Sequence, residues 1–167
     1  MAFFGLLFVS FMLGRRDNVA IFEAGRDALD FNFGGINTLI LLTSSWFVAL
    51  AVNAARRDQV QTLCRCLIGA LLSGAAFGVS KIVEYTREIG AGYTPATNDF
   101  FMYYFTLTGI HFMHVIAGCV VLTVMLLKAR RGGYSGASHA GLEVGATYWH
   151  MVDLLWIVIF PLLYLLR

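Results

Sequence analysis

Charged residues are scarce in this chain. Lys, Arg, Asp and Glu make up 13% of its 167 residues, whereas hydrophobic residues make up 59%, and the mean hydropathy is +0.73. A water-soluble domain of this length could not bury so much apolar surface. The composition therefore predicts an integral membrane protein. Helices are the expected elements, because a helix satisfies its own backbone polar groups inside lipid.

Cysteine is also rare, with three residues in all. Cys64 and Cys66 lie near an expected helix start and Cys119 lies within an apolar segment, a set that does not suggest a disulfide framework. Residues two apart on a helix point to different faces, which favours a structural role for Cys64 and Cys66 over a metal clip. The net charge of +2 is spread over loops, so no nucleic-acid surface is expected.

Motifs for common enzyme chemistry are missing as well: there is no nucleophile–base set, phosphate-binding loop or dinucleotide fingerprint. What the chain has instead is a series of apolar segments, at about residues 2–13, 36–55, 62–85, 99–127 and 141–166. They predict an all-α fold, a single transmembrane domain of residues 1–167 with about five helices.

The first apolar segment is short. A full crossing needs about 20 residues, so this helix is expected to be short or truncated. The segment lacks the basic start and the cleavage site of a secretory signal, and we expect it to be mature structure. A polar connector is expected from residue 15 to residue 35, ended by Gly34 and Gly35.

Small residues recur at a spacing of four in the third segment. Ala70, Gly74 and Gly78 form a small-xxx-small pattern, which allows two helices to approach closely in lipid. We therefore expect this face to be a helix-packing surface.

Basic residues divide evenly between the two sides that five crossings would create. The side of the N-terminus has the denser set, around Arg56–Arg57 and Lys128–Arg131, with few acids beside it. This density favours an N-terminus in the cytoplasm and a C-terminus in the periplasm of a bacterial inner membrane.

Ionisable and polar side chains within the apolar segments are the main functional signal, because such groups are costly at membrane depth. His111 and His114 are three residues apart and are expected to share one helix face, as are His150 and Asp153. Lys81 and Glu84 have the same spacing and could neutralise each other. The candidate site residues are Glu84, His111, His114, Glu143, Trp149, His150 and Asp153.

Three interpretations of these residues compete. A b-type cytochrome would use two of His111, His114 and His150 as haem ligands from different helices. A small transporter or assembly factor would use the histidines and carboxylates as a metal or proton path. In the third interpretation, the groups are interhelical hydrogen bonds and anchors for lipid headgroups. His139 lies in a Gly/Ser-rich loop and is expected to be solvated.

Four motifs occur in one order along the chain. Residues 37–45 read NTLILLTSS, Glu84–Tyr85 closes the next segment, residues 106–118 read TLTGIHFMHVIAG, and residues 148–156 read YWHMVDLLW. Together with His139, Glu143 and Tyr164, they resemble the cytochrome c oxidase subunit III family. The five-segment length and residues 94–105 are most similar to its short branch, the NorE-type proteins associated with nitric oxide reductase, with short quinol-oxidase third subunits as neighbours.

The resemblance implies an accessory membrane subunit of a haem-copper oxidoreductase, either a terminal oxidase or a nitric oxide reductase. Such a subunit has no catalytic residues, no metal site and no cofactor of its own. It packs beside the catalytic haem-copper subunit and other respiratory subunits, and it holds phospholipid between its helices. The family's acidic residue at the start of the first helix has no counterpart in Met1–Phe4, so its proton-uptake role is not expected here.

Overall fold

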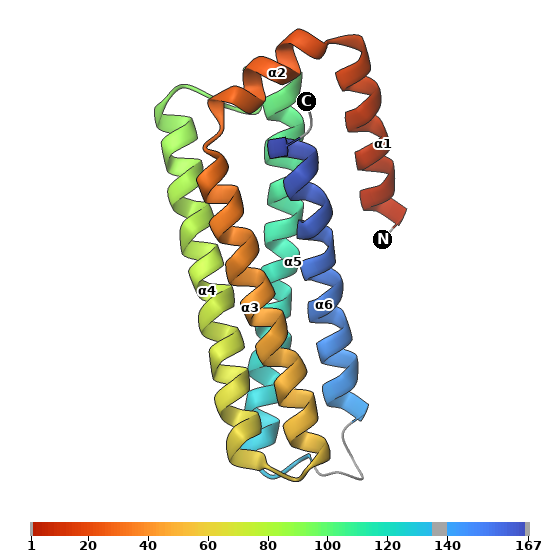
Figure 1. Ribbon diagram of the computed structural model, residues 1–167, viewed down its shortest axis with the longest axis vertical. Coiled ribbons are helices and arrows are strands. Elements are labelled where there is room, and N and C mark those ends of the chain that lie inside the picture. Colours follow the sequence, from red (N-terminus) through yellow and green to blue (C-terminus); the bar gives the residue numbers. More distant parts are fainter. Residues whose placement is uncertain (1, 135–139, 166–167) are drawn as a thin grey trace.

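Helices joined by short turns make up the structure, a computed structural model that describes residues 2–134 and 140–165 (Figure 1). In chain order they are α1 (Ala2–Asp17), α2 (Val19–Ala28), α3 (Phe31–Arg56), α4 (Val60–Gly90), α5 (Asp99–Arg130), α6 (Ala140–Phe160) and the π-helical turn η1 (Pro161–Leu165). The predicted all-α fold is confirmed.

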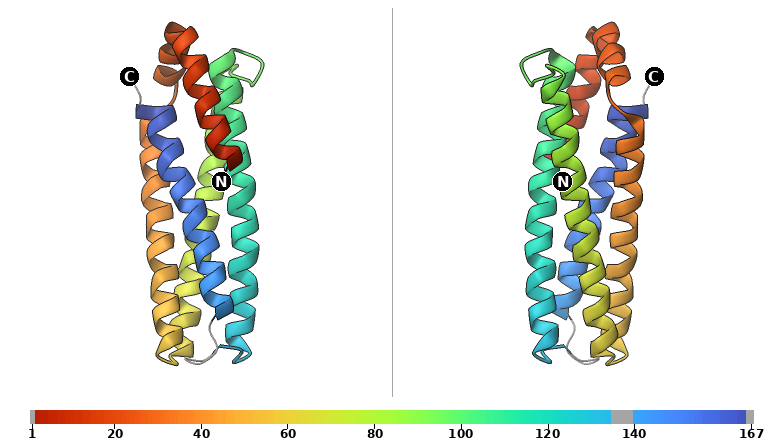
Figure 2. Two further views of the ribbon diagram at one scale, coloured as in Figure 1. Left: turned by 90° about the vertical axis from the view of Figure 1, so that its right-hand side faces the viewer. Right: turned by 90° about the vertical axis from the view of Figure 1, so that its left-hand side faces the viewer.

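The long helices α3, α4, α5 and α6 form an antiparallel bundle, which runs the full height of Figures 1 and 2. The most extensive contact joins α3 and α4, and α6 packs against both α3 and α5. Two of the helices begin with a side-chain cap: Asp30 accepts a hydrogen bond from the backbone N–H of Asn32 and Asn98 accepts one from Phe101. Gly92 and Gly132, with positive φ, follow the ends of α4 and α5.

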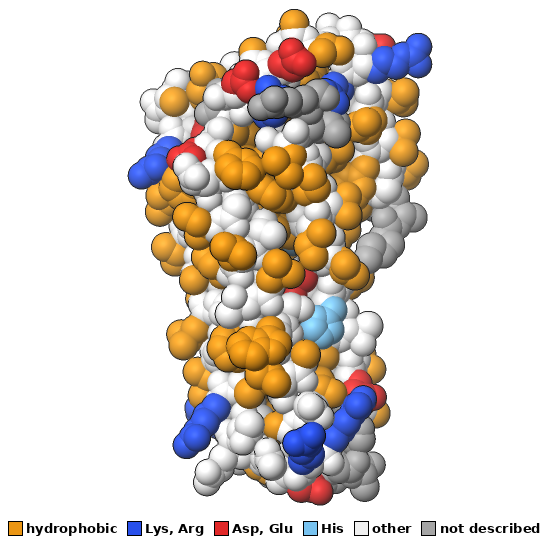
Figure 3. All heavy atoms as spheres, viewed as in Figure 1, with side chains coloured by type: hydrophobic (Ala, Val, Ile, Leu, Met, Phe, Trp, Pro, Cys, Tyr) orange, Lys and Arg blue, Asp and Glu red, His pale blue; other side chains and the backbone are white. Residues whose placement is uncertain are grey.

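Among the described residues, four helices are long and apolar enough to cross a membrane: α3, α4, α5, and α6 together with η1. Sequence analysis predicted about five crossings with a short first helix. The first helix is indeed short, at 16 residues, and is not among the four. Large hydrophobic side chains point outward from every long helix, for example Leu39, Leu72 and Met113. Figure 3 shows this hydrophobic surface between charged side chains at the two ends of the molecule.

The short helices α1 and α2 sit at one end of the bundle. α1 starts about halfway along the bundle and runs to the end where α2 crosses (Figures 1 and 2). Both pack on α5 through aromatic rings: Phe11 and Phe22 contact each other at 5.2 Å between ring centroids, and Phe22 contacts Phe100 at 5.8 Å. The pair therefore covers the start of α5 and leaves most of the bundle untouched.

The predicted polar connector is wrong for most of its length. α1 continues to Asp17, α2 occupies much of the remainder, and α3 begins at Phe31 under the Asp30 cap. Gly34 and Gly35 therefore lie in the first turns of α3. A Cβ on Gly34 would come within 2.7 Å of the Phe160 ring, so this glycine serves close packing. The other helices also extend past their predicted bounds, most clearly α4, which was expected to end at residue 85.

Candidate functional site

An ion pair lies inside the bundle, on α4. The Lys81 Nζ is 2.9 Å from the Glu84 Oε2, and the two side chains are 1% and 4% exposed. The spacing of three residues places both groups on one helix face, as sequence analysis predicted. A buried charge is tolerated when a partner and hydrogen bonds replace its hydration.

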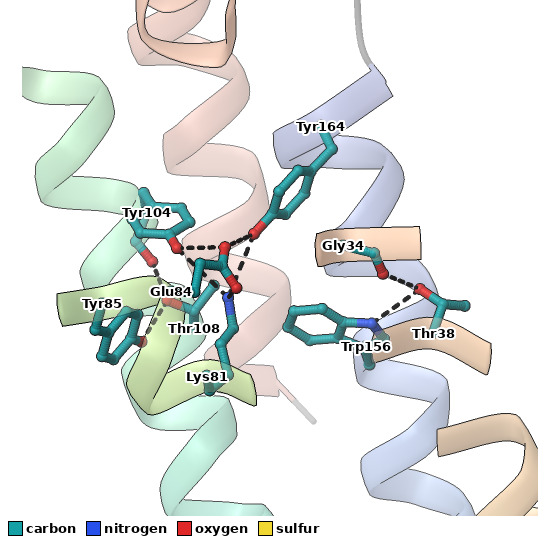
Figure 4. Close-up of polar contacts among 9 residues, drawn as sticks. All are labelled: Gly34, Thr38, Lys81, Glu84, Tyr85, Tyr104, Thr108, Trp156 and Tyr164. Carbon is teal, nitrogen blue, oxygen red and sulfur yellow. Dashed lines mark hydrogen bonds and ion pairs between the residues drawn. The ribbon is translucent and has the colours of Figure 1, made fainter. Parts of the chain in front are cut away.

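Two tyrosines complete this cluster from other helices, and their hydroxyls point toward Glu84 from different directions (Figure 4). The Tyr104 hydroxyl on α5 donates to the Glu84 Oε1 at 2.7 Å, and the Tyr164 hydroxyl on η1 donates to the same oxygen. The Lys81 ammonium also lies 5.0 Å from the centre of the Trp156 ring. We call Lys81, Glu84, Tyr104 and Tyr164 the charge cluster. It joins α4, α5 and the C-terminal turn.

Pro161 explains how Tyr164 reaches the cluster. Proline has no backbone N–H and clashes with the preceding turn, so a helix cannot continue regularly through it. The chain widens into the π-helical turn Pro161–Leu165 at this point. Tyr164 is buried there. Sequence analysis had used Tyr164 and Trp156 only as parts of a motif and had not singled out Tyr104, because nothing in their spacing along the chain reveals a shared partner.

Two further ties surround the charge cluster (Figure 4). The Trp156 indole N–H donates to the Thr38 hydroxyl at 3.0 Å, and that hydroxyl donates to the Gly34 carbonyl. On the other side, the hydroxyls of Tyr85 and Thr108 are 2.6 Å apart. These bonds link α6 to α3 and α4 to α5.

His111 lies one layer further into the bundle and is fully buried. Its ring centroid is 5.2 Å from that of Trp156 and 5.7 Å from that of Phe77. Neither ring nitrogen has a hydrogen-bond partner among the described residues. His111 is thus packed between aromatic rings of α4 and α6.

His114 has different surroundings. Its Nδ1 is 2.8 Å from the Ile110 carbonyl, and its ring packs edge-on against Phe4 of α1 at 5.5 Å. His111 and His114, which were expected to share a helix face, therefore contact different helices: His111 packs against α4 and α6, and His114 packs against α1. His150 faces α3, so the three histidines meet three separate environments. This arrangement counts against the bis-histidine haem interpretation, which needs two imidazoles facing each other.

His150 and Asp153 lie on the side of α6 that meets α3. The His150 Nδ1 is 2.5 Å from the Ser45 Oγ. Asp153 is 3% exposed, and neither of its carboxylate oxygens has a hydrogen-bond partner among the described residues. The Ser45 hydroxyl is near enough to interact with this carboxylate, but the hydrogen bond that it makes is the one with His150.

A pocket of about 520 Å³ opens between α3 and α6 below His150. An ion pair borders it, with the Arg56 guanidinium 2.7 Å from the Glu143 carboxylate. Both side chains are partly exposed, and the remaining walls are polar and small residues that include Asn53, Ala146 and Thr147. The pocket therefore combines an ion pair with small polar and apolar walls near one end of the bundle.

Small residues meet a large ring where α4, α5 and α6 converge. Trp149 is fully buried, and its indole N–H has no partner among the described residues. A Cβ at Gly118 would lie 2.7 Å from this ring, and one at Gly74 would lie 3.0 Å from it. Ala70 is buried, and its carbonyl accepts a hydrogen bond from Ser44 of α3. Gly78 borders an apolar groove between α4 and α5.

Within residues 2–134 and 140–165, no group of three or more His, Cys, Asp or Glu side chains is arranged to hold a metal ion. His139 and its expected solvation lie outside the described residues. Of the predicted site residues, the structure brings His150 together with Ser45 and Glu84 together with Lys81, while His111, His114 and Glu143 lie apart from one another.

The bundle defines a class: a multi-pass helical membrane protein that buries several polar and charged side chains between its helices. Residues 24–166 match the family model described as cytochrome c oxidase subunit III, and the chain belongs to that family. The resemblance predicted from the motifs is thereby confirmed.

Individual relatives agree. The chain is 34% identical over 132 residues to cytochrome c oxidase subunit 3 of Thermostichus vulcanus, covering 78% of this chain and 64% of the relative. It is 29% identical over 143 residues to cytochrome bo(3) ubiquinol oxidase subunit 3 of Pseudomonas aeruginosa, covering 86% and 68%. The chain thus spans about two thirds of the length of these relatives.

A third relative has a different layout. Heme-copper oxidase subunit I+III of Aeropyrum pernix is 33% identical over 171 residues, which cover 98% of this chain but 21% of the relative. The segment similar to this chain is thus a minor part of a much longer protein.

Proposed function

We propose that this chain is an accessory subunit of a haem-copper oxidoreductase, with no catalytic residue, metal or redox cofactor of its own. The observation that carries the proposal is the family match over residues 24–166, which includes all four candidate membrane-spanning helices. The described polar groups support it, because they tie helices together. Glu84 and Lys81 join three elements, and Trp156 joins α6 to α3.

The proposed partner is the catalytic subunit of the same enzyme. The Aeropyrum pernix relative is named heme-copper oxidase subunit I+III, which supports a subunit I as the partner. In this chain, large hydrophobic side chains cover the outside of the bundle, which suits contact with lipid and with the helices of a larger neighbour. Other respiratory subunits are further candidates for contact.

The pocket between α3 and α6 supports a finer proposal, the binding of a phospholipid. A headgroup phosphate would meet Arg56, and the acyl chains would lie along the exposed hydrophobic side chains beyond the pocket. With this anchor, the subunit would stabilise the catalytic subunit and shape the access of gas or protons to it.

The acceptor of the partner enzyme is either oxygen or nitric oxide. Residues 94–105 favour the nitric oxide reductase branch, the NorE-type proteins, as the assignment to test first. We place the protein in a bacterial inner membrane, with the ends of α3 and α5 on the cytoplasmic side and η1 on the periplasmic side (Figure 1). The dense basic residues at the ends of α3 and α5 support this orientation.

Purification from the native membrane in mild detergent tests the function. A tagged chain is expected to bring down a haem-copper subunit, seen as a visible haem spectrum and as a second band identified by mass spectrometry. Deleting the chain is expected to lower the turnover rate of the enzyme or to shorten the time for which the enzyme stays active. Absence of a haem-copper subunit, together with unchanged and lasting turnover in the deletion strain, would contradict the proposal. A haem spectrum from the chain purified alone would favour the cytochrome interpretation instead.

A further inference from the structure

Asp153 forms no ion pair with any residue that the structure describes. Its side chain is 3% exposed in the core of a membrane-spanning helix, and both carboxylate oxygens lack hydrogen-bond partners within the described residues. Glu84 has Lys81 and two tyrosines to compensate its burial, whereas Asp153 has no such set. An ionisable residue at membrane depth that lacks a structural partner is a candidate for moving or holding protons.

A short route connects this carboxylate to the surface. His150 lies one helical turn away and borders the pocket of about 520 Å³, which Arg56 and Glu143 also line. Its Nδ1 is 2.5 Å from the Ser45 hydroxyl. The same hydroxyl is near enough to interact with the Asp153 carboxylate, although it makes no hydrogen bond to it in this structure. Imidazole and hydroxyl groups are the usual carriers in such chains.

The route stops beyond Asp153. His111 on α5 is the next titratable group in the core, but it is enclosed by Phe77 and Trp156 and makes no hydrogen bond among the described residues. Further on, Lys81 is paired with Glu84. Other titratable groups on the packed helices include Glu88, Tyr85 and Cys66 on α4 and Tyr104, Cys119 and the half-buried His114 on α5. Among residues 2–134 and 140–165, the core therefore offers access from the pocket, and its hydrogen bonds form no continuous polar path to the opposite end.

We propose that Asp153 is a proton-binding site loaded from the pocket between α3 and α6 through His150 and Ser45. In the loading step, protonated His150 gives a proton to the Ser45 oxygen, that hydroxyl turns toward Asp153, and its own proton passes to the carboxylate. His150 is then neutral and takes its next proton from water in the pocket. The site holds a proton and does not conduct protons across the membrane. It depends only on this chain's own residues, so its failure would leave the proposed oxidoreductase partner untouched.

Infrared difference spectroscopy of the purified full-length protein in lipid nanodiscs tests the site. Spectra are recorded between alkaline and neutral solution, with unlabelled protein and with protein carrying aspartate labelled with ¹³C at its carboxyl carbon. Asp153 is the only buried aspartate among the described residues. Exposed aspartates stay ionised in both solutions. We expect a protonated carboxylic acid band that shifts with the label and shifts again on transfer to D₂O. The absence of a labelled band, or a band whose frequency does not change in D₂O, would overturn the proposal.

Substitutions identify which residues hold the proton and which carry it from the pocket. Asp153→Asn is expected to abolish the labelled band, and Glu143→Gln, at the pocket rim, is expected to keep it. His150→Gln should slow the D₂O shift by roughly 10²-fold, because a positioned acid–base group typically contributes at least that much. His114→Gln, on another face, should leave the rate unchanged. Equal exchange rates in the two histidine variants would remove His150 from the route. If Asp153→Asn does not fold, the label in the unaltered protein still decides.

Discussion

The carboxylate of Glu84 holds together groups from three parts of the chain: Lys81 on its own helix, Tyr104 on α5 and Tyr164 on η1. Replacing this carboxylate with a neutral amide should therefore destabilise the protein. We expect Glu84→Gln to lower the free energy of unfolding by about 3–5 kcal/mol, because it leaves the Lys81 ammonium buried without a counter-charge. Detergent-mediated unfolding in mixed micelles, followed by tryptophan fluorescence, measures this difference.

Two controls separate charge from shape at this position. The double variant Lys81→Met/Glu84→Gln removes both charges and should recover much of the stability. Arg56→Gln breaks an ion pair whose side chains are 58% and 40% exposed, and its cost should stay at about 0–1 kcal/mol. If the Glu84→Gln variant is as stable as the unaltered protein, the charge cluster does not stabilise the fold.

His150 and Ser45 form a smaller pair between α6 and α3. We expect His150→Leu to cost about 1–3 kcal/mol, because it leaves the Ser45 hydroxyl without its partner at a helix interface. The same unfolding assay measures the change. Thr147→Val, one turn earlier, loses only a bond to the Glu143 carbonyl of its own helix and should be close to neutral. Equal stability of the two variants would argue against the pair as a tie.

At the scale of the element, the start of α3 shows how two adjacent glycines differ. A Cβ on Gly34 would lie 2.7 Å from the Phe160 ring, whereas one on Gly35 would have nothing within 4 Å. Gly34→Ala should therefore destabilise the protein by about 1–3 kcal/mol, since α3 and α6 must separate. Gly35→Ala should be neutral or slightly stabilising, because alanine is the better helix former. Thermal unfolding of the two variants decides, and a reversed order would contradict the packing.

These two glycines also mark the limit of the sequence-based prediction. In the sequence alone, Gly34–Gly35 resembles the end of a loop. Only the position of Phe160, far along the chain, shows why a glycine occupies position 34 within a helix. By contrast, the four long helices follow from apolar runs bounded by charges, and the Lys81–Glu84 pair follows from helical spacing. Local signals are visible in the sequence, whereas contacts between distant segments are not.

The candidate site shows the same division. Glu84, His111, Trp149 and Asp153 could be selected as buried because they interrupt apolar segments, and all four are buried. Their partners could not be read from the sequence: Tyr104 looked like one of several aromatics near a helix start, and Ser45 like part of a motif. A partner depends on the register between helices, which the antiparallel packing of α3 with α6 and of α4 with α5 decides.

At the scale of the whole molecule, the described chain has two parts that meet along α5. The helices α1 and α2 contact α5 and each other (Figure 2). Their buried rings Phe11 and Phe22 join the hydrophobic core of α3 to α6 at its α5 side. Gly25 lies at the contact: a Cβ there would fall 2.3 Å from the Phe100 ring, so a larger side chain must push α2 away. We therefore expect Gly25→Leu to release α1 and α2 without unfolding the bundle.

Hydrogen exchange followed by mass spectrometry measures this separation in detergent micelles. In the Gly25→Leu variant, amides of residues 4–29 should exchange faster, whereas those in the middle of α3, α4, α5 and α6 should keep their protection, since local openings can be independent of the core. Gly5→Leu, whose Cβ would meet nothing within 4 Å, is the matched control on α1 and should leave both parts unchanged. Loss of protection throughout the bundle in Gly25→Leu would mean that α1 and α2 belong to the same cooperative unit as the four long helices.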